Sequence, residues 1–259
     1  MSRLIHTKSE LLKLETENGV LKVVWCFWGG GEMNETRKLS FRMLQENIGV
    51  PICLITNDNV QEFVLTNTPL HSAYPYLSAV HQSDYLRSYF LHHYGGAWHD
   101  VKATMVSFDK VWQAFVDENV FLIGRPEIKG GPARVYDVEG RWLPDYWQDL
   151  ISAGYWVGRP YSALSSELFQ NMTTFLDTNM TSLKRYPAKH PREKKIEKKF
   201  FISKFLKKLS YLSQGRNIHY PLPWTLFGNI FHPVNYRFRN NILKTLPCDT
   251  VKNAGVRHR

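Results

Sequence analysis

The sequence predicts an α/β fold, in which a mixed, mostly parallel sheet is flanked by helices, and three observations carry this prediction. Two apolar runs rich in β-branched residues, VLKVVWCF at 20–27 and VPICLIT at 50–56, are typical of buried parallel strands. The segment 35–47 between them repeats its apolar residues at helical spacing and is followed by glycine and proline. A further helix and strand are expected within 83–104. This alternation of strands and helices favours a layered α/β structure.

Length and composition are consistent with a single domain over 1–259. Apolar residues make up 43% of the chain, which is typical of a globular protein. The aromatic share of 14% is high and suits a binding site in which aromatic side chains stack on rings. No run approaches the roughly 20 apolar residues of a membrane span. The first residues lack the apolar core of a signal peptide. We therefore expect a cytoplasmic protein.

Residues 83–104 predict a helix, a glycine turn and a strand. Ser83 is a good N-cap, and apolar residues recur behind it at the spacing of a buried stripe. Gly95 stands where a helix end favours a left-handed residue, and Gly96 prolongs the break. We expect the helix to begin at Ser83 and end at the glycines, and a strand to follow at 97–106.

Four charged side chains should converge in this arrangement. Asp84 and Arg87 are three residues apart and share a helix face. Asp100 and Lys102 share a strand face with Trp98, and lie about 7 Å apart along the strand. The tight turn brings the two pairs together at the end of a buried strand. Each pair alone is also typical of an ordinary surface ion pair, and the combination is what favours a functional site.

The order of residues in this stretch resembles the core of the GT-A glycosyltransferases. The motif reads Ser-Asp-x-x-Arg at 83–87, Tyr-Gly-Gly at 94–96, and an aromatic residue, one residue and Asp at 98–100. It is similar to the capsular-polysaccharide-synthesis enzymes, the DXD-type sugar transferases related to the yeast initiating mannosyltransferases, and the glucosylating bacterial toxins. The pattern Lys-apolar-apolar-x-x-apolar-Trp at 22–28 extends the resemblance. It covers about residues 20–180 and implies a GT-A-like domain with its nucleotide-sugar-binding core there.

The resemblance leaves the metal question open. In relatives the strand ends in Asp-x-Asp, which holds a divalent cation (Mn or Mg) on the nucleotide diphosphate. This chain has Asp100 at the first position and Lys102 at the second. Asp100 would hold ribose or a metal, and His232 matches the late histidine that several GT-A enzymes supply to the metal or diphosphate. Without a metal, Lys102 would itself pair with the diphosphate.

Four donor-binding residues follow from the resemblance and from their positions. Trp28 ends the first strand before a glycine run and matches the Trp that stacks on the nucleotide base in the toxins. Asp58 follows the second strand, where this fold commonly reads base or ribose, although a turn former is equally expected there. Asp84 would bond donor-sugar hydroxyls. Arg87 would neutralise the charge that develops on the leaving diphosphate.

The remaining elements follow from periodicity and turn residues. We expect a short helical lead-in at 2–19, and then, in order, a helix, a strand, a loop, a strand and a helix at 108–117, 120–124, 126–147, 152–158 and 161–179. The loop carries aromatic rings and carboxylates, which suit an acceptor sugar. An inverting transfer needs a general base, and the sequence does not choose among Glu127, Asp137, Glu139, Asp145 and Asp149.

The basic residues are concentrated late in the chain, within a C-terminal part at 185–259. Residues 189–208 hold nine Lys or Arg and two Glu, a net +7 of the chain's +10. The helix expected next has an apolar arc and an opposite basic face: Phe201, Ile202, Phe205, Leu206, Leu209 and Leu212, against Lys204, Lys207 and Lys208. This pattern is typical of a helix that lies on an anionic membrane surface, here through 189–212. A core helix with a solvated lysine face is the alternative.

Prolines dominate the end of the chain, at 221, 223 and 233. Because proline lacks an amide proton and disrupts a helix interior, we expect neither a long helix nor a central strand there.

These observations together predict a glycosyltransferase that moves a sugar from a nucleotide-diphosphate donor to a glycan acceptor, such as a lipid-linked capsule or lipopolysaccharide precursor. Asp100, Lys102 and Arg87 are its expected catalytic residues. Two other functions remain open: a degenerate, non-catalytic nucleotide-binding protein, which Lys102 favours, and a nucleic-acid-binding protein, which the basicity favours. We expect no nucleic acid partner, because the basic residues cluster in one helix with no recognisable reading motif.

Overall fold

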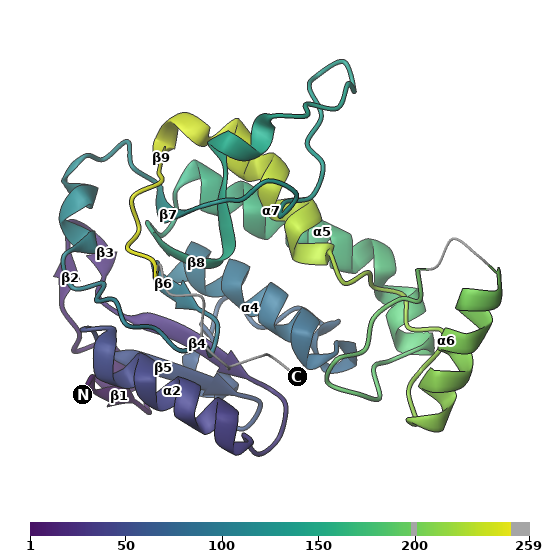
Figure 1. Ribbon diagram of the computed structural model, residues 1–259. Helices are drawn as coiled ribbons and strands as arrows, with labels where there is room; N and C mark the ends of the chain where they lie inside the picture. The colour runs from purple at the N-terminus through teal and green to yellow at the C-terminus, as the bar shows by residue number, and fades with distance from the viewer. Residues whose placement is uncertain (198–200, 250–259) are drawn as a thin grey trace.

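A seven-stranded sheet forms the centre of the computed structural model, which describes residues 1–197 and 201–249, with the backbone alone at 201–204 (Figure 1). In spatial order its strands are β1 (Leu4–Ile5), β5 (Ile52–Thr56), β4 (Val24–Trp28), β6 (Gly96–His99), β8 (Ile151–Gly158), β7 (Leu122–Pro126) and β9 (Ile242–Leu243). Only β8 runs antiparallel to its neighbours. The predicted mixed, mostly parallel sheet flanked by helices is confirmed.

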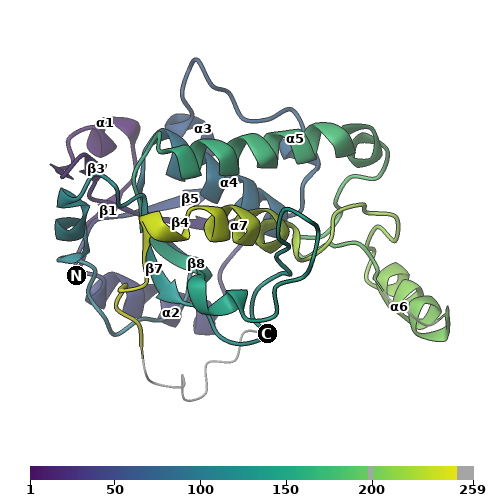
Figure 2. The same cartoon turned by 90° about the horizontal axis from the view of Figure 1, so that it is seen from above.

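Helices cover both faces of the sheet, as Figures 1 and 2 show. The α-helices are α1 (Lys8–Leu11), α2 (Glu35–Asn47), α3 (Val60–Phe63), α4 (Ala79–His93), α5 (Ala163–Arg185), α6 (Phe201–Ser213) and α7 (Leu226–Arg237). Short 3-10 helices are η1 (Tyr74–Tyr76), η2 (Val111–Val116), η3 (Tyr146–Asp149) and η4 (Arg239–Asn241). One face packs on α4, α5 and α7, and the other on α2 and η2.

Strand β4 shows why its sequence is apolar throughout. Trp25 and Phe27 belong to the core on the α4 side, whereas Val24 and Cys26 belong to the core on the α2 side. A strand covered by helices on both faces cannot alternate polar with apolar residues. The predicted run divides before Val24, because its first two residues form β3 (Val20–Leu21) in a separate hairpin with β2 (Thr16–Glu17).

Several expected boundaries are wrong; the helix expected at 161–179, for instance, is α5 and ends at Arg185. Helix α4 begins at Ala79 after the N-cap Ser78, four residues before Ser83. The lead-in at 2–19 contributes β1 and β2 as well as a single helical turn, and the helix at 108–117 is the shorter 3-10 helix η2. Strand β6 ends at His99, so Asp100 and Lys102 lie in the loop after it.

The expectation of no long helix at the chain end is also wrong. Pro233 lies inside α7, a helix of 12 residues. Its apolar face packs into the core through Phe227, Phe231 and Val234, which are nearly fully buried. This burial offsets the hydrogen bond that proline cannot make.

The glycine turn between α4 and β6 forms as predicted. Gly95 and Gly96 have φ angles of +68° and +90°. The Gly95 carbonyl accepts a hydrogen bond of 2.8 Å from the indole Nε1 of Trp25, and this indole stacks on Phe90 of α4 at 4.3 Å. The turn is therefore fixed from the core strand β4, which sets the position of the residues that follow it.

Substituting Gly95 tests this turn. We expect Gly95→Ala to lower the free energy of unfolding by roughly 3 kcal/mol or more, because a left-handed φ is combined with overpacking. A Cβ there would lie 2.5 Å from Pro160 Cδ and 2.8 Å from the Gly158 carbonyl oxygen. Gly215→Ala is the matched control, since its φ is +65° and nothing lies within 4 Å of its Cβ position. Equal losses in urea unfolding of the two variants would contradict the packing part of this argument.

A long excursion connects β7 to β8 and has a small apolar cluster of its own. Val135, Tyr146 and Leu150 are buried together, apart from the two main cores. The Tyr146 hydroxyl donates to the Ala133 carbonyl, and the Ala133 amide donates to His232 of α7 at 3.1 Å. The predicted loop at 126–147 is therefore irregular but packed.

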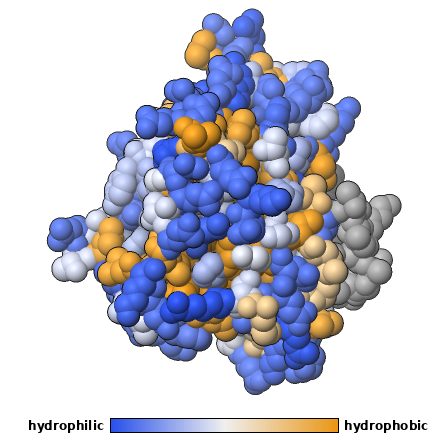
Figure 3. Space-filling view, turned by 90° about the vertical axis from the view of Figure 1, so that its left-hand side faces the viewer, coloured by the Kyte–Doolittle hydropathy of each residue, from blue (hydrophilic) through white to orange (hydrophobic). Residues whose placement is uncertain are grey.

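At the edge formed by the N-terminal strands, hydrophilic residues predominate and hydrophobic ones are scattered (Figure 3). On the other side, α6 projects away from the sheet (Figures 1 and 2). Among the described residues, no helix combines the length and apolar character that crossing a membrane requires.

Candidate functional site

A cleft of about 480 Å³ opens at the carboxyl ends of β4 and β6. This is the edge at which open α/β sheets bind ligands, and the volume is in the range of small-molecule sites. Its lining includes four aromatic residues, four cationic residues and two carboxylates from distant parts of the chain: Phe27, Trp28, Trp98, Trp224, Arg37, Arg87, Lys102, Arg192, Asp84 and Asp100. Its charged lining therefore carries two more positive than negative groups.

Asp100 lies at the centre of the charged groups. One carboxylate oxygen accepts from Lys102 Nζ at 2.9 Å. The other lies 3.5 Å from Arg87 Nη2 and accepts from the indole of Trp98 at 3.3 Å. The predicted convergence of Asp84, Arg87, Asp100 and Lys102 is therefore present.

The pairing of Asp100 and Lys102 differs from the strand geometry that the sequence suggested. Because β6 ends at His99, the chain turns, and the Lys102 amide donates to the Asp100 carbonyl at 2.6 Å. The turn replaces a separation of about 7 Å along an extended strand by direct contact of the side chains. Both oxygens of Asp100 are consequently engaged by donors.

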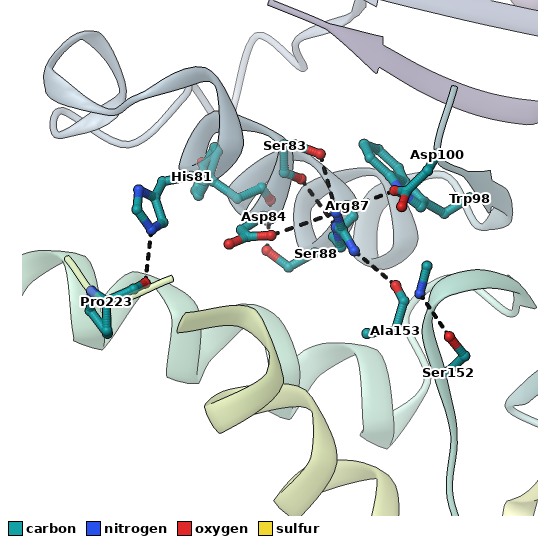
Figure 4. Close-up of polar contacts among 12 residues, drawn as sticks. His81, Ser83, Asp84, Arg87, Ser88, Trp98, Asp100, Ser152, Ala153 and Pro223 are labelled. Atoms are coloured by element: carbon teal, nitrogen blue, oxygen red, sulfur yellow. Dashed lines mark hydrogen bonds and ion pairs between the residues drawn. The ribbon is translucent and has the colours of Figure 1, made fainter. Parts of the chain in front are cut away.

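Arg87 is held in place by contacts from three elements, as Figure 4 shows for its polar partners. It donates to the Ala153 carbonyl of β8 at 2.8 Å and to the Ser83 hydroxyl at 3.2 Å, and lies 3.6 Å from Asp84. Its guanidinium also lies 4.6 Å from the ring centre of Phe227 in α7. Ser83, expected as an N-cap, instead orients this arginine.

The two carboxylates have opposite pKa shifts. Burial raises the pKa of Asp100, but the charges of Lys102 and Arg87 outweigh burial and hold that pKa well below its usual range. Burial also raises the pKa of Asp84, and there it prevails: Arg87 opposes it only in part, the Asp100 charge adds to it, and the pKa reaches about 7. The cleft therefore holds one carboxylate that is ionised at neutral pH and one that changes protonation near it.

This shift gives a pH-dependent stability. The folded protein keeps a proton on Asp84 over a range, from about pH 4 to 7, in which the unfolded chain has lost it, so unfolding becomes easier as the pH rises through that window. We expect Asp84→Asn to remove this slope. Relative to the unmodified protein, the variant should gain on the order of 2–4 kcal/mol between pH 5 and pH 8 in urea unfolding. Asp58→Asn, at an exposed carboxylate, is the matched control. If the free energies of unfolding of Asp84→Asn and the unmodified protein differ by the same amount at pH 5 and pH 8, the raised pKa of Asp84 is contradicted.

Three cleft residues escaped the sequence analysis. Arg37 comes from the first turn of α2, donates to the Val101 carbonyl and lies 5.4 Å from the ring centre of Trp28. Arg192 and Trp224 precede and follow α6. Arg192 also lowers the pKa of Arg37, after the larger effect of burial, so the two cations influence one another across the cleft. Trp28, at the end of β4, lies in the cleft as expected.

Two of the predicted site residues lie outside this cleft. Asp58 is exposed in the turn after β5. His232 is buried in α7, where it accepts from the Ala133 amide and lies 3.7 Å from Glu127. Both residues were predicted to bind the donor or a metal from where they stand along the chain. Position along the chain does not determine the direction in which a side chain points.

The donor set does not fit a divalent cation. The two carboxylate oxygens of Asp100 contact Lys102, Arg87 and Trp98, and His232 does not line the cleft. Within 1–197 and 201–249 there is no group of three or more His, Cys, Asp or Glu side chains arranged to hold a metal. Two positive side chains against the carboxylate would repel a cation rather than coordinate it.

None of the five candidate bases lines the cleft. Asp137 and Glu139 pair with Arg141 at the exposed tip of the β7–β8 excursion, and Asp149 lies near Lys244. Glu127 is half-buried beside His232; burial raises its pKa, but the nearby His232 side chain and a hydrogen bond from the Ile128 amide lower it more. Asp84 is the carboxylate of the cleft whose pKa suits proton transfer at neutral pH.

A family model described as "Capsular polysaccharide synthesis protein" matches residues 3–143, which is more than half of the chain and includes Trp28, Arg37, Asp84, Arg87, Asp100 and Lys102. A search among curated proteins finds no match.

Proposed function

Because the chain belongs to the capsular polysaccharide synthesis protein family, we propose that it is a GT-A-type glycosyltransferase that moves a sugar from a nucleotide-diphosphate sugar to a glycan acceptor of capsule or lipopolysaccharide synthesis. The observation that carries this proposal is the cationic cleft at the carboxyl ends of β4 and β6. Four cationic side chains line the cleft at this edge of the sheet, and the two carboxylates there balance only half of their charge. A diphosphate supplies the missing negative charge.

The leaving group sets the main electrostatic demand of this reaction. When the glycosidic bond to the diphosphate breaks, negative charge grows on the phosphate oxygens, and fixed positive groups lower the energy of that state. Arg87 and Lys102 provide this charge, and Asp100 holds both in place through contacts of 3.5 and 2.9 Å. Because Arg87 is also fixed by β8, little reorganisation is needed when the charge develops.

The remaining cleft residues suit the other parts of the donor. Trp28 presents an aromatic face at the end of β4, next to Arg37, and would stack on the nucleotide base. Asp84 changes protonation near neutral pH, so it can donate to a sugar hydroxyl or accept from one. The β7–β8 excursion would receive the acceptor: Ala133 lies beside Gly228, next to Phe227, whose ring contacts Arg87.

Donor turnover by the purified protein tests the proposal. A panel of nucleotide-diphosphate sugars is screened first by thermal shift and then for sugar release or transfer to short glycans. We expect one or a few donors to raise the melting temperature and to be consumed. Stabilisation by a donor without any turnover would favour the non-catalytic nucleotide-binding protein that Lys102 suggests. No stabilisation by any nucleotide would contradict the site.

A further inference from the structure

Helix α6 is oriented with its apolar side outward. The side chains of Phe205, Leu206, Leu209 and Leu212 are 53%, 60%, 48% and 56% exposed. Tyr211, on the other side of the helix, is 1% exposed, and Lys207 lies over its ring at 5.1 Å. The side chains of Phe201, Ile202 and Lys204 lie outside the described residues. The described part of the helix therefore disagrees with a core helix that turns a lysine face to water.

The base of α6 is fixed to the body by buried polar contacts. Glu193 is fully buried and accepts from the backbone amides of Lys189, His190 and Asn217, on both sides of the helix in sequence. Its own carbonyl accepts from Ser78 at the start of α4. The helix thus projects from an anchored base, so its exposed apolar side is a built feature of the fold rather than a frayed end.

The segment that leads into and forms this helix is strongly basic in sequence. Residues 189–208 carry a net +7, and one of their two glutamates is the buried Glu193. Described lysines lie on the flanks of the helix, where Lys207 and Lys208 are half-buried. Apolar side chains bordered by lysines match the interface of an anionic bilayer. The apolar side chains enter among the acyl chains, and the lysines lie among the negatively charged headgroups.

We propose that α6 seats this protein on an anionic lipid bilayer. A second copy of the chain is a poorer occupant, because it would bring another +7 against the same surface. A nucleic acid would pair with the lysines but leave the four apolar side chains in water. The bilayer satisfies both parts of the surface.

Seating α6 on a bilayer also brings the cleft to the membrane. The cleft is lined by Pro191 and Arg192, which precede α6 in the chain, and by Trp224, which follows it. Lys194 lies over the ring of Trp224 at 4.5 Å, so the basic segment and the cleft mouth are continuous. With the glycosyltransfer proposed above, this continuity identifies the acceptor as a lipid-linked glycan, which is held in the bilayer that α6 contacts.

Vesicle binding tests the seating independently of catalysis. The protein is sedimented with phosphatidylglycerol–phosphatidylcholine vesicles and with phosphatidylcholine vesicles at low salt. We expect at least about tenfold stronger binding to the anionic vesicles, and about a tenfold loss in Leu206→Gln/Leu209→Gln, since two apolar side chains leave the interface. Lys195→Gln/Lys207→Gln/Lys208→Gln should lose a similar factor at low salt. Leu12→Gln/Val116→Gln is the matched control: these residues are 73% and 76% exposed, lie outside α6, and should leave binding unchanged.

Three outcomes would overturn the proposal. The first is unmodified protein that does not bind anionic vesicles. The second is a dimer that the leucine substitutions convert to a monomer without any change in vesicle binding. The third is binding to duplex DNA that depends on the lysines but not on the leucines. Turnover on a soluble acceptor should be unchanged in the α6 variants, because α6 does not line the cleft. If the unmodified protein binds anionic vesicles but turns over no donor, the result contradicts the proposed function and not the membrane seating.

Discussion

Replacing Asp100 by alanine is expected to lower sugar transfer by about 10²–10³-fold or more, while the chain still folds. The carboxylate contacts Arg87 and Lys102 at 3.5 and 2.9 Å. Without it the two cations repel one another and Lys102 loses its carboxylate partner, while Arg87 is still held by Ala153 and Ser83. Turnover of the donor found in the screen, measured with saturating acceptor, checks this. Asp100→Asn should behave similarly, since the amide keeps the shape but not the charge.

Stability separates a site role from a structural one. The depressed pKa of Asp100 means that its ionised form stabilises the fold above about pH 4, and that this contribution disappears as the pH falls through the folded-state pKa. The Asp100 variants should therefore lose some stability at pH 7. Glu167→Gln is the matched control, because its carboxylate also pairs with an arginine, Arg237, but outside the cleft and the β7–β8 excursion. An Asp100→Ala protein whose folded fraction is fully active would show that the residue is structural.

Lys102 should make donor use independent of divalent metal. We expect turnover to persist in EDTA, and Lys102→Ala to weaken donor binding by about 10–100-fold, or about 1.4–2.8 kcal/mol, because the diphosphate loses one of its cationic partners. Lys102→Asp places a second carboxylate beside Asp100, so it should either create a requirement for manganese or abolish turnover. Lys102→Arg, which keeps the charge, is the control and should retain part of the activity.

Metal titration decides the alternative. If the turnover of the unmodified protein vanishes in EDTA and returns with manganese, Lys102 does not replace the metal. Asp100 would then have to leave its two cationic partners when the cation enters.

The sequence predicted the centre of the site because that centre is local. The spacing of Asp84, Arg87, Asp100 and Lys102 and a turn at Gly95 lie within one short stretch, so helix and strand geometry suffices to bring them together. The first turn of the helix was placed wrongly because Ser78 and Ser83 are both acceptable N-caps. Asp100 and Lys102 were expected about 7 Å apart on one strand face, and their direct contact was missed because nothing local marked the end of the strand at His99.

Long-range features could not be predicted in the same way. Arg37, Arg192 and Trp224 reach the cleft from segments far apart in the chain, and their sequence neighbourhoods resemble any helix start or basic stretch. Periodicity showed that α6 has an apolar arc, but it does not report which side of a helix meets the rest of the protein. His232 shows the opposite error. Its residue type and its place along the chain suited a metal or diphosphate ligand, but its side chain is buried and accepts a hydrogen bond from the Ala133 amide.

The separate apolar cluster beneath the β7–β8 excursion has a kinetic consequence. Val135, Tyr146 and Leu150 pack with one another and not with the main cores, so this segment can open without exposing the apolar side chains that hold the sheet. The free energy of such local opening is smaller than that of global unfolding, and the amides of the excursion should exchange with solvent before those of β4 and β6. If the proposed transfer takes place here, the acceptor enters and the product leaves by local opening of this one segment, while the cleft at the ends of β4 and β6 stays intact. The opening rate then depends on the packing of Val135, Tyr146 and Leu150, none of which lines that cleft.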